Sequence, residues 1–386
     1  MSISTSALKN QASELGFVLC GVTACAEPGR LQQFHAWIDA GFAGQMHYLS
    51  DRRAAYADPN SILNGCRSIV MLALPYGASD SGGSQQVSDN PRTQVLNQPC
   101  SQTVRVATYA TGQLDYHDVI HGKLKQLKSW LEARHPTAKV RGIVDTAPLL
   151  EREFGELAGL GWVGKNTLLL NRRWGSYFFL AALLTDLPLD LDPPTEKGYC
   201  GTCTACLQAC PTQAFPRPFV LDATRCISYL TIEHRDHIAS ELASGLGDWL
   251  FGCDVCQEVC PWNRKTPQVA EAALAGQEEL QRMDPRLILR MTDDEFRQRF
   301  RKTPLWRSRR RGIVRNALLC IGNQRMDAAL DDVIPLLRDT EPLIRAASAW
   351  AMGRLQGDGW RNAIEQALAT ELDSAVQAAM ARALSS

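Results

Sequence analysis

A run of four closely spaced cysteines in the middle of the chain constrains its fold more than any other feature. The run has the spacing C-x2-C-x2-C-x3-C-P and consists of Cys200, Cys203, Cys206 and Cys210, with Pro211 after the last. Three thiolates at this spacing can hold one iron–sulfur cubane, while the fourth points away toward a second cluster. The run therefore predicts a segment that folds around two [4Fe–4S] clusters.

A second, shorter run supplies most of the remaining ligands. It has the spacing C-x2-C-x3-C-P and consists of Cys253, Cys256 and Cys260, followed by Pro261. Leu250 stands where a first cysteine would be, so Cys226 is the remaining candidate for the eighth ligand. Pseudo-symmetric pairing assigns one cluster to Cys200, Cys203, Cys206 and Cys260. It assigns the other cluster to Cys210, Cys226, Cys253 and Cys256. We therefore expect a ferredoxin-like module over residues 191–284.

Two zinc sites are the alternative, because C-x2-C also suits tetrahedral zinc. The triple spacing and the two Cys-Pro endings favour iron–sulfur clusters instead. The N-terminus lacks the apolar core of a signal peptide, and no run of about 18 apolar residues occurs, so we expect a cytoplasmic protein with no membrane span. Thirteen cysteines in such a protein indicate metal or redox chemistry rather than disulfides.

Residues 1–190 alternate predicted strands and helices, which indicates an α/β layer architecture. We expect strands at Ser68–Leu74, Val104–Tyr109, Val140–Val144, Thr167–Leu170 and Tyr177–Leu184. We expect helices through Val119–Leu131 and near Leu149–Ala158. Residues 77–103 are polar and have no period, which predicts a long mobile loop. An electron carrier with two clusters needs far fewer residues, so this region favours an enzyme whose clusters feed an acceptor within it.

Asp145 ends the strand Val140–Val144, at the kind of position where ligands gather in α/β sheets. The next three residues end in Pro148 and precede a helix, so Asp145 also suits a helix N-cap. The other interpretation is a buried general acid, since burial raises the pKa of a carboxyl group. The sequence alone leaves both interpretations open and somewhat favours the cap.

Two nearby motifs have simpler interpretations. Residues 159–166 (GLGWVGKN) nearly spell a phosphate loop, but Asn166 replaces the Mg²⁺-binding Ser or Thr and the stretch follows a helix. Such a glycine-rich loop suits close approach of the backbone to a large cofactor instead. Asp115 precedes a helix that carries His117, which indicates a cap and one hydrogen-bonded histidine.

From about residue 285 the sequence is helical and repetitive. Val314–Ala317, Ile344–Ala347 and Val376–Ala379 are similar, at offsets of 30 and 32 residues. This period indicates helical repeats of the HEAT type over residues 285–386, rather than a few unrelated amphipathic helices.

A basic stretch opens these repeats, in a chain whose formal net charge is zero. No acidic residue occurs from Arg297 to Arg315. Basic side chains around an aromatic ring suit neutralisation of phosphates and stacking on a single-stranded RNA loop, although a solvated helix face is the simpler interpretation. The predicted RNA-binding residues are Arg297, Arg301, Lys302, Trp306, Arg307, Arg309, Arg310, Arg311 and Arg315.

Several stretches together resemble the epoxyqueuosine reductases, the cobalamin-dependent enzymes of the last step of queuosine synthesis in tRNA. These stretches are VDTAPLLER (Val144–Arg152), GLGWVGKNTLLLNR (Gly159–Arg172), Gly175–Phe179, RCISYLTIE (Arg225–Glu233), both cysteine runs and the terminal repeats. The pairing of clusters with cobalamin is also similar to that in reductive dehalogenases.

The resemblance implies a base-off cobalamin between residues 1–190 and the clusters, and a nitroreductase-like or dehalogenase-like fold for that region. It implies that Asp145 is the proton donor. The residues that it places at the cofactor are Tyr109, Asp145, Lys165, Asn166, Leu169, Ser176, Ser228, Cys253 and Asp254. Thr108 departs from the family, which often has Arg there.

The expected function is reduction of epoxyqueuosine to queuosine at the tRNA wobble position by a monomer that takes electrons from an external low-potential donor. One rival is reductive dehalogenation of a small molecule, for which the repeats and basic stretch would be unnecessary. The other rival is a two-cluster electron-transfer subunit, which would not need Asp145 or the glycine-rich loop.

Overall fold

A four-stranded sheet forms the centre of the N-terminal part of the chain. The computed structural model describes residues 4–77, 103–267, 271–355 and 358–385, so the predicted loop at 77–103 lies almost wholly outside the described residues. The strands of the sheet are β1 (Leu19–Ala24), β2 (Ser68–Pro75), β4 (Val140–Ile143) and β7 (Phe178–Thr185). Their order is β1-β2-β7-β4, and every neighbouring pair is antiparallel.

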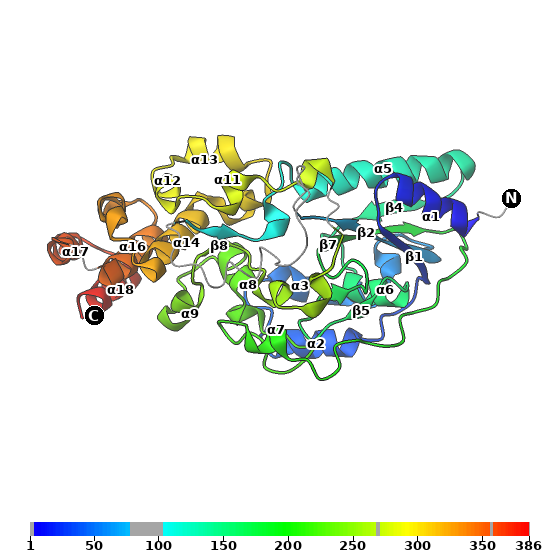
Figure 1. Cartoon of the computed structure of the whole chain (residues 1–386), viewed down its shortest axis with the longest axis horizontal. Coiled ribbons are helices and arrows are strands. Elements are labelled where there is room, and N and C mark those ends of the chain that lie inside the picture. The colour runs from blue at the N-terminus through cyan, green and yellow to red at the C-terminus, as the bar shows by residue number, and fades with distance from the viewer. Residues whose placement is uncertain (1–3, 78–102, 268–270, 356–357, 386) are drawn as a thin grey trace.

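Helices cover both faces of this sheet (Figure 1). One face packs on α1 (Thr5–Glu14) and α5 (Tyr116–Arg134), and the other packs on α6 (Glu151–Leu157). Side chains alternate along a strand, so Val70 of β2 belongs to the first cluster and its neighbour Met71 to the second. This double burial explains why β2 is a continuous apolar run. The other elements before β2 are α2 (Leu31–Asp39), α3 (His47–Asp51) and 3-10 turns at Arg53–Ala57 and Pro59–Ser61.

The predicted strand Val104–Tyr109 does not join this sheet. Only β3 (Arg105–Val106) is extended, and it pairs in parallel with β8 (Trp249–Phe251) from the cysteine-rich segment. A 3-10 turn, Thr108–Ala110, follows it. The predicted strand Thr167–Leu170 shortens to β6 (Leu169–Leu170), which pairs with β5 (Trp162–Val163) in a separate hairpin. The prediction of a strand at Val104–Tyr109 was too long, because its partner β8 lies far along the chain and leaves no local signal. Residues 167–168 stay outside β6 because they form the turn of the local hairpin, where Thr167 has a φ of +65°.

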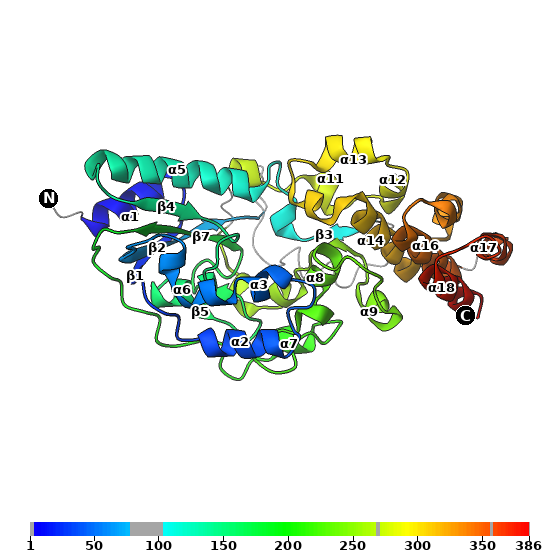
Figure 2. The same ribbon diagram turned by 180° about the vertical axis from the view of Figure 1, so that it is seen from behind.

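The cysteine-rich segment consists of short elements joined by irregular backbone. Its helices are α7 (Ala205–Gln208), α8 (Ile227–Ile232), α9 (Ser240–Gly245) and α10 (Val255–Glu258). Further 3-10 turns lie at Ala223–Arg225, Pro261–Asn263 and Ala272–Leu274, and α11 (Glu278–Gln281) ends the segment. In both views the segment lies between the sheet and the C-terminal helices (Figures 1 and 2).

The C-terminal part is a stack of helices at the opposite end of the molecule from β1 (Figures 1 and 2). Its helices are α12 (Pro285–Leu289), α13 (Asp293–Phe300), α14 (Arg309–Gln324), α15 (Leu330–Val333), α16 (Pro342–Leu355), α17 (Trp360–Leu368) and α18 (Ser374–Leu384), with 3-10 turns at Pro304–Ser308, Asp327–Ala329 and Ile334–Arg338. The three similar tetrapeptides fall in α14, α16 and α18, which pack in that order. A Cβ on Gly322 would lie 2.6 Å from the Trp350 ring, which shows how closely α14 and α16 approach.

The core of these repeats reaches back into the N-terminal part of the chain. Val104, Val106 and Ala110 belong to the same hydrophobic cluster as the buried residues of α14, α16 and α18. Residue 190 therefore separates the sheet from the cysteine segment along the sequence, but not in space. Residues 104–110 precede this boundary, yet they pack with the C-terminal helices.

Candidate active site

The cysteines gather in two groups. Cys200, Cys203, Cys206 and Cys260 line one cavity of about 220 Å³. Burial raises the pKa of Cys206, and the charges of the other three cysteines raise it further. This group contains one residue, Cys260, that is distant in sequence from the rest, and it matches the set predicted for one cluster.

The second group consists of Cys210, Cys226, Cys253 and Cys256, and charges within it likewise raise the pKa values of Cys226 and Cys253. Burial raises the pKa of Cys226, and Cys210 adds to this effect; burial followed by Cys256 and Cys226 raises the pKa of Cys253. The charge of Cys206 contributes to the raised pKa of Cys256, so the two groups are neighbours. Among the described residues no His, Cys, Asp or Glu side chains are grouped for binding of a single metal ion. Cubane ligands instead surround a cavity, as the first group does.

A second cavity, of about 610 Å³, borders the second cysteine group at Cys226. Five tyrosines line it, together with Asp145, His117, Arg307, Ser228 and the cluster cysteine Cys226. We call this cavity the catalytic cleft. A reactant held there would lie beside the cluster ligand Cys226 and beside the hydrogen-bonded side chains around Asp145, which we call the constellation.

Asp145 stands in the cleft on a strained turn. Its φ is +40°, and Thr146 N donates to Val144 O across it at 2.5 Å, which closes a γ-turn. A residue other than glycine adopts this conformation only when its surroundings enforce it. Helix α6 begins at Glu151 with Leu150 as its N-cap residue, so the interpretation of Asp145 as a helix cap was wrong.

The argument from burial was also wrong, because the Asp145 side chain is 42% exposed. The argument from the sheet edge fails too, since it applies to parallel strands and this sheet is antiparallel. Neighbouring side chains define the position of Asp145 instead. Tyr116 Oη donates to its Oδ2, and His117 Nε2 lies 2.7 Å from its Oδ1.

His117 links Asp145 to a second carboxylate. Its Nδ1 lies 2.8 Å from Oδ1 of Asp115, which caps α5 by accepting from His117 N. Burial alone would lower the pKa of His117, but the hydrogen bonds to Asp115 and Asp145 outweigh it and raise the pKa to about 9. The imidazole is therefore protonated at neutral pH and holds a proton beside Asp145.

Arg307 closes this constellation from the C-terminal part of the chain. Its Nη2 lies 3.2 Å from Asp115 Oδ1 and 2.6 Å from His117 Nδ1, and its guanidinium lies 5.0 Å from the centre of the Tyr116 ring. The arginine opposes protonation of His117, but two carboxylates face the ring and prevail. The helical part thus contributes directly to the cleft.

The backbone of the Asp145 turn is held from two sides. Asp145 N donates to Glu151 Oε1 at 2.8 Å, and Arg52 donates to Thr146 O at 2.8 Å. Burial and the nearby charge of Asp145 raise the pKa of Glu151 to about 8. These contacts provide the external support that a strained turn needs.

The structure separates the predicted cofactor residues into three places. Tyr109 and Ser228 line the catalytic cleft with Asp145. Lys165 donates to the carbonyls of Gly201 and Cys203 and, with Asn166, lines the first cysteine cavity. The others are buried or bonded elsewhere: Leu169, Ser176, Cys253 and Asp254.

Buried hydrogen bonds join Ser176 and Thr108 to the second cysteine run, which contains Asp254 and Gln257. Ser176 Oγ donates to Gln257 Oε1 at 2.8 Å. Asp254 is buried and accepts from both N and Oγ1 of Thr108, at 2.7 and 2.6 Å. Thr108 thus anchors the polypeptide beside Tyr109 although it departs from the family pattern. Burial raises the pKa of Tyr109, which stays a neutral phenol.

The residues of the predicted basic stretch also differ in position: some are exposed, and others are paired or buried. Arg297, Arg301, Lys302, Arg309 and Arg311 are exposed, and Arg309 lies 4.4 Å from the centre of the Trp306 ring. Arg310 pairs with Asp339. Arg315 is only 2% exposed and donates to the carbonyls of Leu230, His234 and Asp236, so the prediction that it binds RNA was wrong. A buried arginine in a helix has the same sequence signature as an exposed one.

Five residues of the constellation were not predicted for the site: Asp115, Tyr116, His117, Glu151 and, in its catalytic position, Arg307. Glu151 lies in the motif VDTAPLLER and could have been singled out from it. The contacts of Arg307 with residues nearly two hundred positions away could not have been found from the sequence.

This fold and these two sites define an oxidoreductase that uses two [4Fe–4S] clusters. A 4Fe–4S double cluster binding domain matches residues 199–263, a domain of epoxyqueuosine reductase QueG (DUF1730) matches residues 57–146, and HEAT repeats match residues 307–385. The repeat prediction is confirmed. The part of the chain that the structure describes contains no helix long and apolar enough to span a bilayer.

The relatives give the family. The epoxyqueuosine reductase of Pseudomonas aeruginosa is 35% identical over 348 residues, which cover 90% of this chain and 93% of that protein. The Escherichia coli enzyme is 32% identical over 347 residues, covering 90% and 88%. The chain therefore belongs to the epoxyqueuosine reductase family.

Solved structures of the family have the same fold. An epoxyqueuosine reductase in complex with an epoxyqueuosine-modified tRNA-Tyr stem loop aligns with a TM-score of 0.88 at 28% identity, covering 98% of this chain and 97% of that one. A Bacillus subtilis enzyme, captured with an aspartate-bearing catalytic loop swung out of the active site, aligns with a TM-score of 0.87 at 27% identity, covering 98% of each chain.

Proposed function

We propose that this protein reduces epoxyqueuosine to queuosine at the wobble position of tRNA, with cobalamin and two [4Fe–4S] clusters, and that Asp145 supplies the proton. The observation that carries the proposal is the catalytic cleft, whose wall contains both Asp145 with its hydrogen-bonded partners and the cluster cysteine Cys226. Residues 1–190, 191–284 and 285–386 would be the catalytic, cluster and RNA-binding regions.

The reaction takes up two electrons and two protons, breaks both carbon–oxygen bonds of the epoxide, forms the alkene and releases water. Cobalamin, when bound, would supply the reducing centre at the epoxide. Tyr109 and Ser228 are the predicted cofactor residues that share the cleft with Asp145, and we expect them to hold it. The other predicted contacts at Lys165, Asn166 and Ser176 would support the cluster side.

Asp145 would protonate the departing oxygen, because an alkoxide is a poor leaving group. His117 would replace that proton, since its Nε2 lies 2.7 Å from Asp145 and its pKa of about 9 keeps it protonated at neutral pH. Tyr116 would fix the second carboxylate oxygen, so that one lone pair faces the cleft.

The test is anaerobic reconstitution with iron, sulfide and cobalamin, followed by turnover of tRNA that contains epoxyqueuosine. We expect about eight iron atoms and a single cobalt per chain, and conversion to queuosine measured by nucleoside mass spectrometry. Iron incorporation without bound cobalamin or turnover would exclude the proposed reaction.

A further inference from the structure

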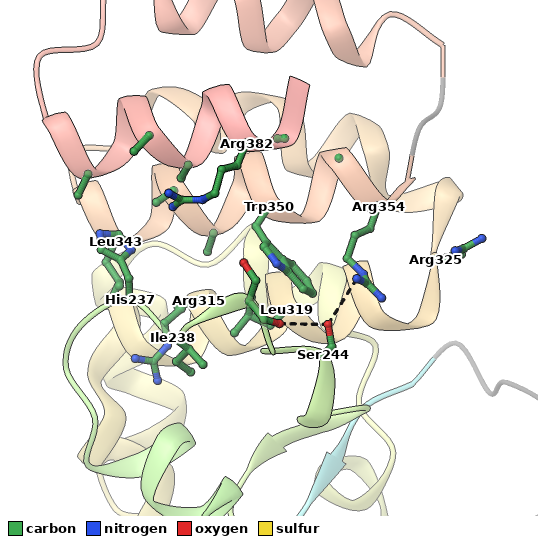
Figure 3. A pocket seen from close by; sticks show the side chains of 18 residues that line it. His237, Ile238, Ser244, Arg315, Leu319, Arg325, Leu343, Trp350, Arg354 and Arg382 are labelled. Carbon is green, nitrogen blue, oxygen red and sulfur yellow. Dashed lines mark hydrogen bonds between the residues drawn. The ribbon is translucent and has the colours of Figure 1, made fainter. Parts of the chain in front are cut away.

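A third cavity, of about 620 Å³, lies between the terminal repeats and the segment around α9 (Figure 3). Alanines of α16 and α18, among them Ala347 and Ala379, line it. The indole of Trp350 stands in it. Arginines surround this ring: Arg354 beside it, Arg382 from α18 and Arg325 at the rim. We call this cavity the repeat cavity.

The charge of the repeat cavity is one-sided. Its lining, among the described residues, includes Arg325, Arg354 and Arg382 but no Asp or Glu. The fourth lining arginine, Arg315, is buried on backbone carbonyls, and burial lowers the pKa of His237, so neither is counted here. Arg325 and Arg354 make no ion pair within the described ranges. Elsewhere in the same repeats arginines are matched with carboxylates, as in Arg345–Glu371 and Arg290–Asp332. In a chain of zero net charge, this local excess indicates an anionic ligand.

The aromatic ring narrows the class of that ligand. The Arg354 guanidinium lies 4.9 Å from the centre of the half-buried Trp350 ring and donates to Gly322 O at 3.3 Å and toward Ser244 Oγ at 3.5 Å. A flat ring with cations around it suits a nucleobase with its phosphate, because the base stacks and the phosphate pairs with arginine. A simple anion would not require the indole.

A narrow crevice lies between the repeat cavity and the catalytic cleft. It shares Ile232 with the cleft, and it shares Arg315 and Leu343 with the repeat cavity. Arg235 and Arg311 lie along it. Of these two, Arg311 is exposed, so it offers a cation at the surface between the cleft and the repeat cavity.

We propose that the repeat cavity binds a nucleotide of the tRNA substrate outside the wobble position, with its base on Trp350 and its phosphate on Arg354 and Arg325. This inference rests on the proposed function and places part of RNA recognition on α16 and α18, beyond the basic stretch at 297–315. Binding here would fix the register of the strand while the wobble nucleotide occupies the cleft.

The test compares the double variant Arg325→Gln/Arg354→Gln with the wild-type holoenzyme. Fluorescence anisotropy would measure binding of an unmodified tRNA-Tyr anticodon stem loop as a function of salt. We expect about 10-fold weaker binding and a salt slope reduced by about one to two units, one for each phosphate that the variant no longer neutralises. With modified tRNA, KM should rise while kcat stays unchanged, since the cleft is intact.

Arg361→Gln is the matched control. Arg361 also covers an indole on a repeat helix, 4.6 Å from the centre of the Trp360 ring, but it lies outside the cavity lining. Equal affinity of the double variant and the wild type would overturn the inference and leave the proposed function intact. A wild-type protein that binds no RNA would instead overturn both.

A competition with free GMP distinguishes a site for a nucleotide of the tRNA from a site for a free nucleotide. Loss of GMP binding in the double variant, with RNA affinity unchanged, would make the cavity a site for a free nucleotide and contradict the proposal. Thermal melting of each variant would confirm that the fold is retained.

Discussion

The cysteine module and the catalytic cleft differ in how they are encoded. Seven of the eight proposed cluster ligands lie in two short runs, and only Cys226 stands apart. The cleft brings together residues from five separated segments, represented by Arg52, Tyr116, Asp145, Ser228 and Arg307. A cluster organises the backbone around itself, so local spacing suffices. A proton-transfer site needs a carboxylate and its partners held at hydrogen-bond distance, which only the complete fold provides.

The largest effect should follow from breaking the module beside the cleft. Cys256→Ala removes a ligand of the second cluster, and we expect turnover to be abolished while the first cluster persists. Iron analysis and electron paramagnetic resonance should find about four iron atoms per chain instead of about eight. A control, Cys20→Ala, changes a partly buried cysteine outside both groups and should keep full iron content. Normal turnover with half of the iron would show that the second cluster is dispensable.

The next effect concerns the contact between helix α14 of the repeats and the cysteine-rich segment. Arg315→Met leaves the carbonyls of Leu230, His234 and Asp236 without their donor, so the free energy of unfolding should fall by about 2–4 kcal/mol. Denaturant unfolding of the reconstituted protein would measure this change. The salt dependence of tRNA binding should not change, because Arg315 is buried; a smaller slope would restore its predicted role in RNA binding.

His117 should set the alkaline limit of the reaction. Its pKa is raised to about 9, so the protonated form that resupplies Asp145 predominates at neutral pH and is lost as the pH rises through 9. We expect kcat to fall above that pH. His117→Gln keeps a donor toward Asp145 but cannot titrate, so it should lower kcat about 100-fold at pH 7 and abolish the alkaline limb. A wild-type rate that is flat to about pH 10 would contradict this role.

The smallest effect should come from the support of the strained turn. Glu151→Ala removes the acceptor for Asp145 N, and we expect kcat to fall about 10-fold with little change in KM, because the carboxylate is less well positioned. Glu151→Gln keeps an acceptor at the same place and should retain most of the activity. Equal losses in both variants would contradict this role, because the acceptor that Gln retains would then make no difference.

Local sequence predicted those features whose physical cause is local. The cysteine spacings predicted the double cluster segment, the 30- and 32-residue offsets predicted the repeats, and the cap of α5 by Asp115 followed from residue type. Long-range effects were missed. The pairing of β3 with β8 and the burial of Arg315 depend on partners far along the chain.

Asp145 shows the limit most clearly. Its sequence context suggested a cap or a buried acid, but the structure places it on an exposed γ-turn with φ of +40°. Propensity disfavours that conformation, and the contacts to Glu151, His117 and Tyr116 maintain it. The resemblance to the family pointed to the residue, whereas residue-level reasoning did not supply the geometry.

The most direct test of the account is single-turnover reduction of epoxyqueuosine tRNA by the reconstituted Asp145→Asn variant. The asparagine keeps the size of the side chain but cannot give up a proton as the carboxyl group does, so the account predicts normal cluster content, normal tRNA affinity and a rate at least about 100-fold below that of the wild type. Turnover at the wild-type rate, with clusters and binding intact, would show that the proton comes from elsewhere and would contradict the proposed role of the cleft.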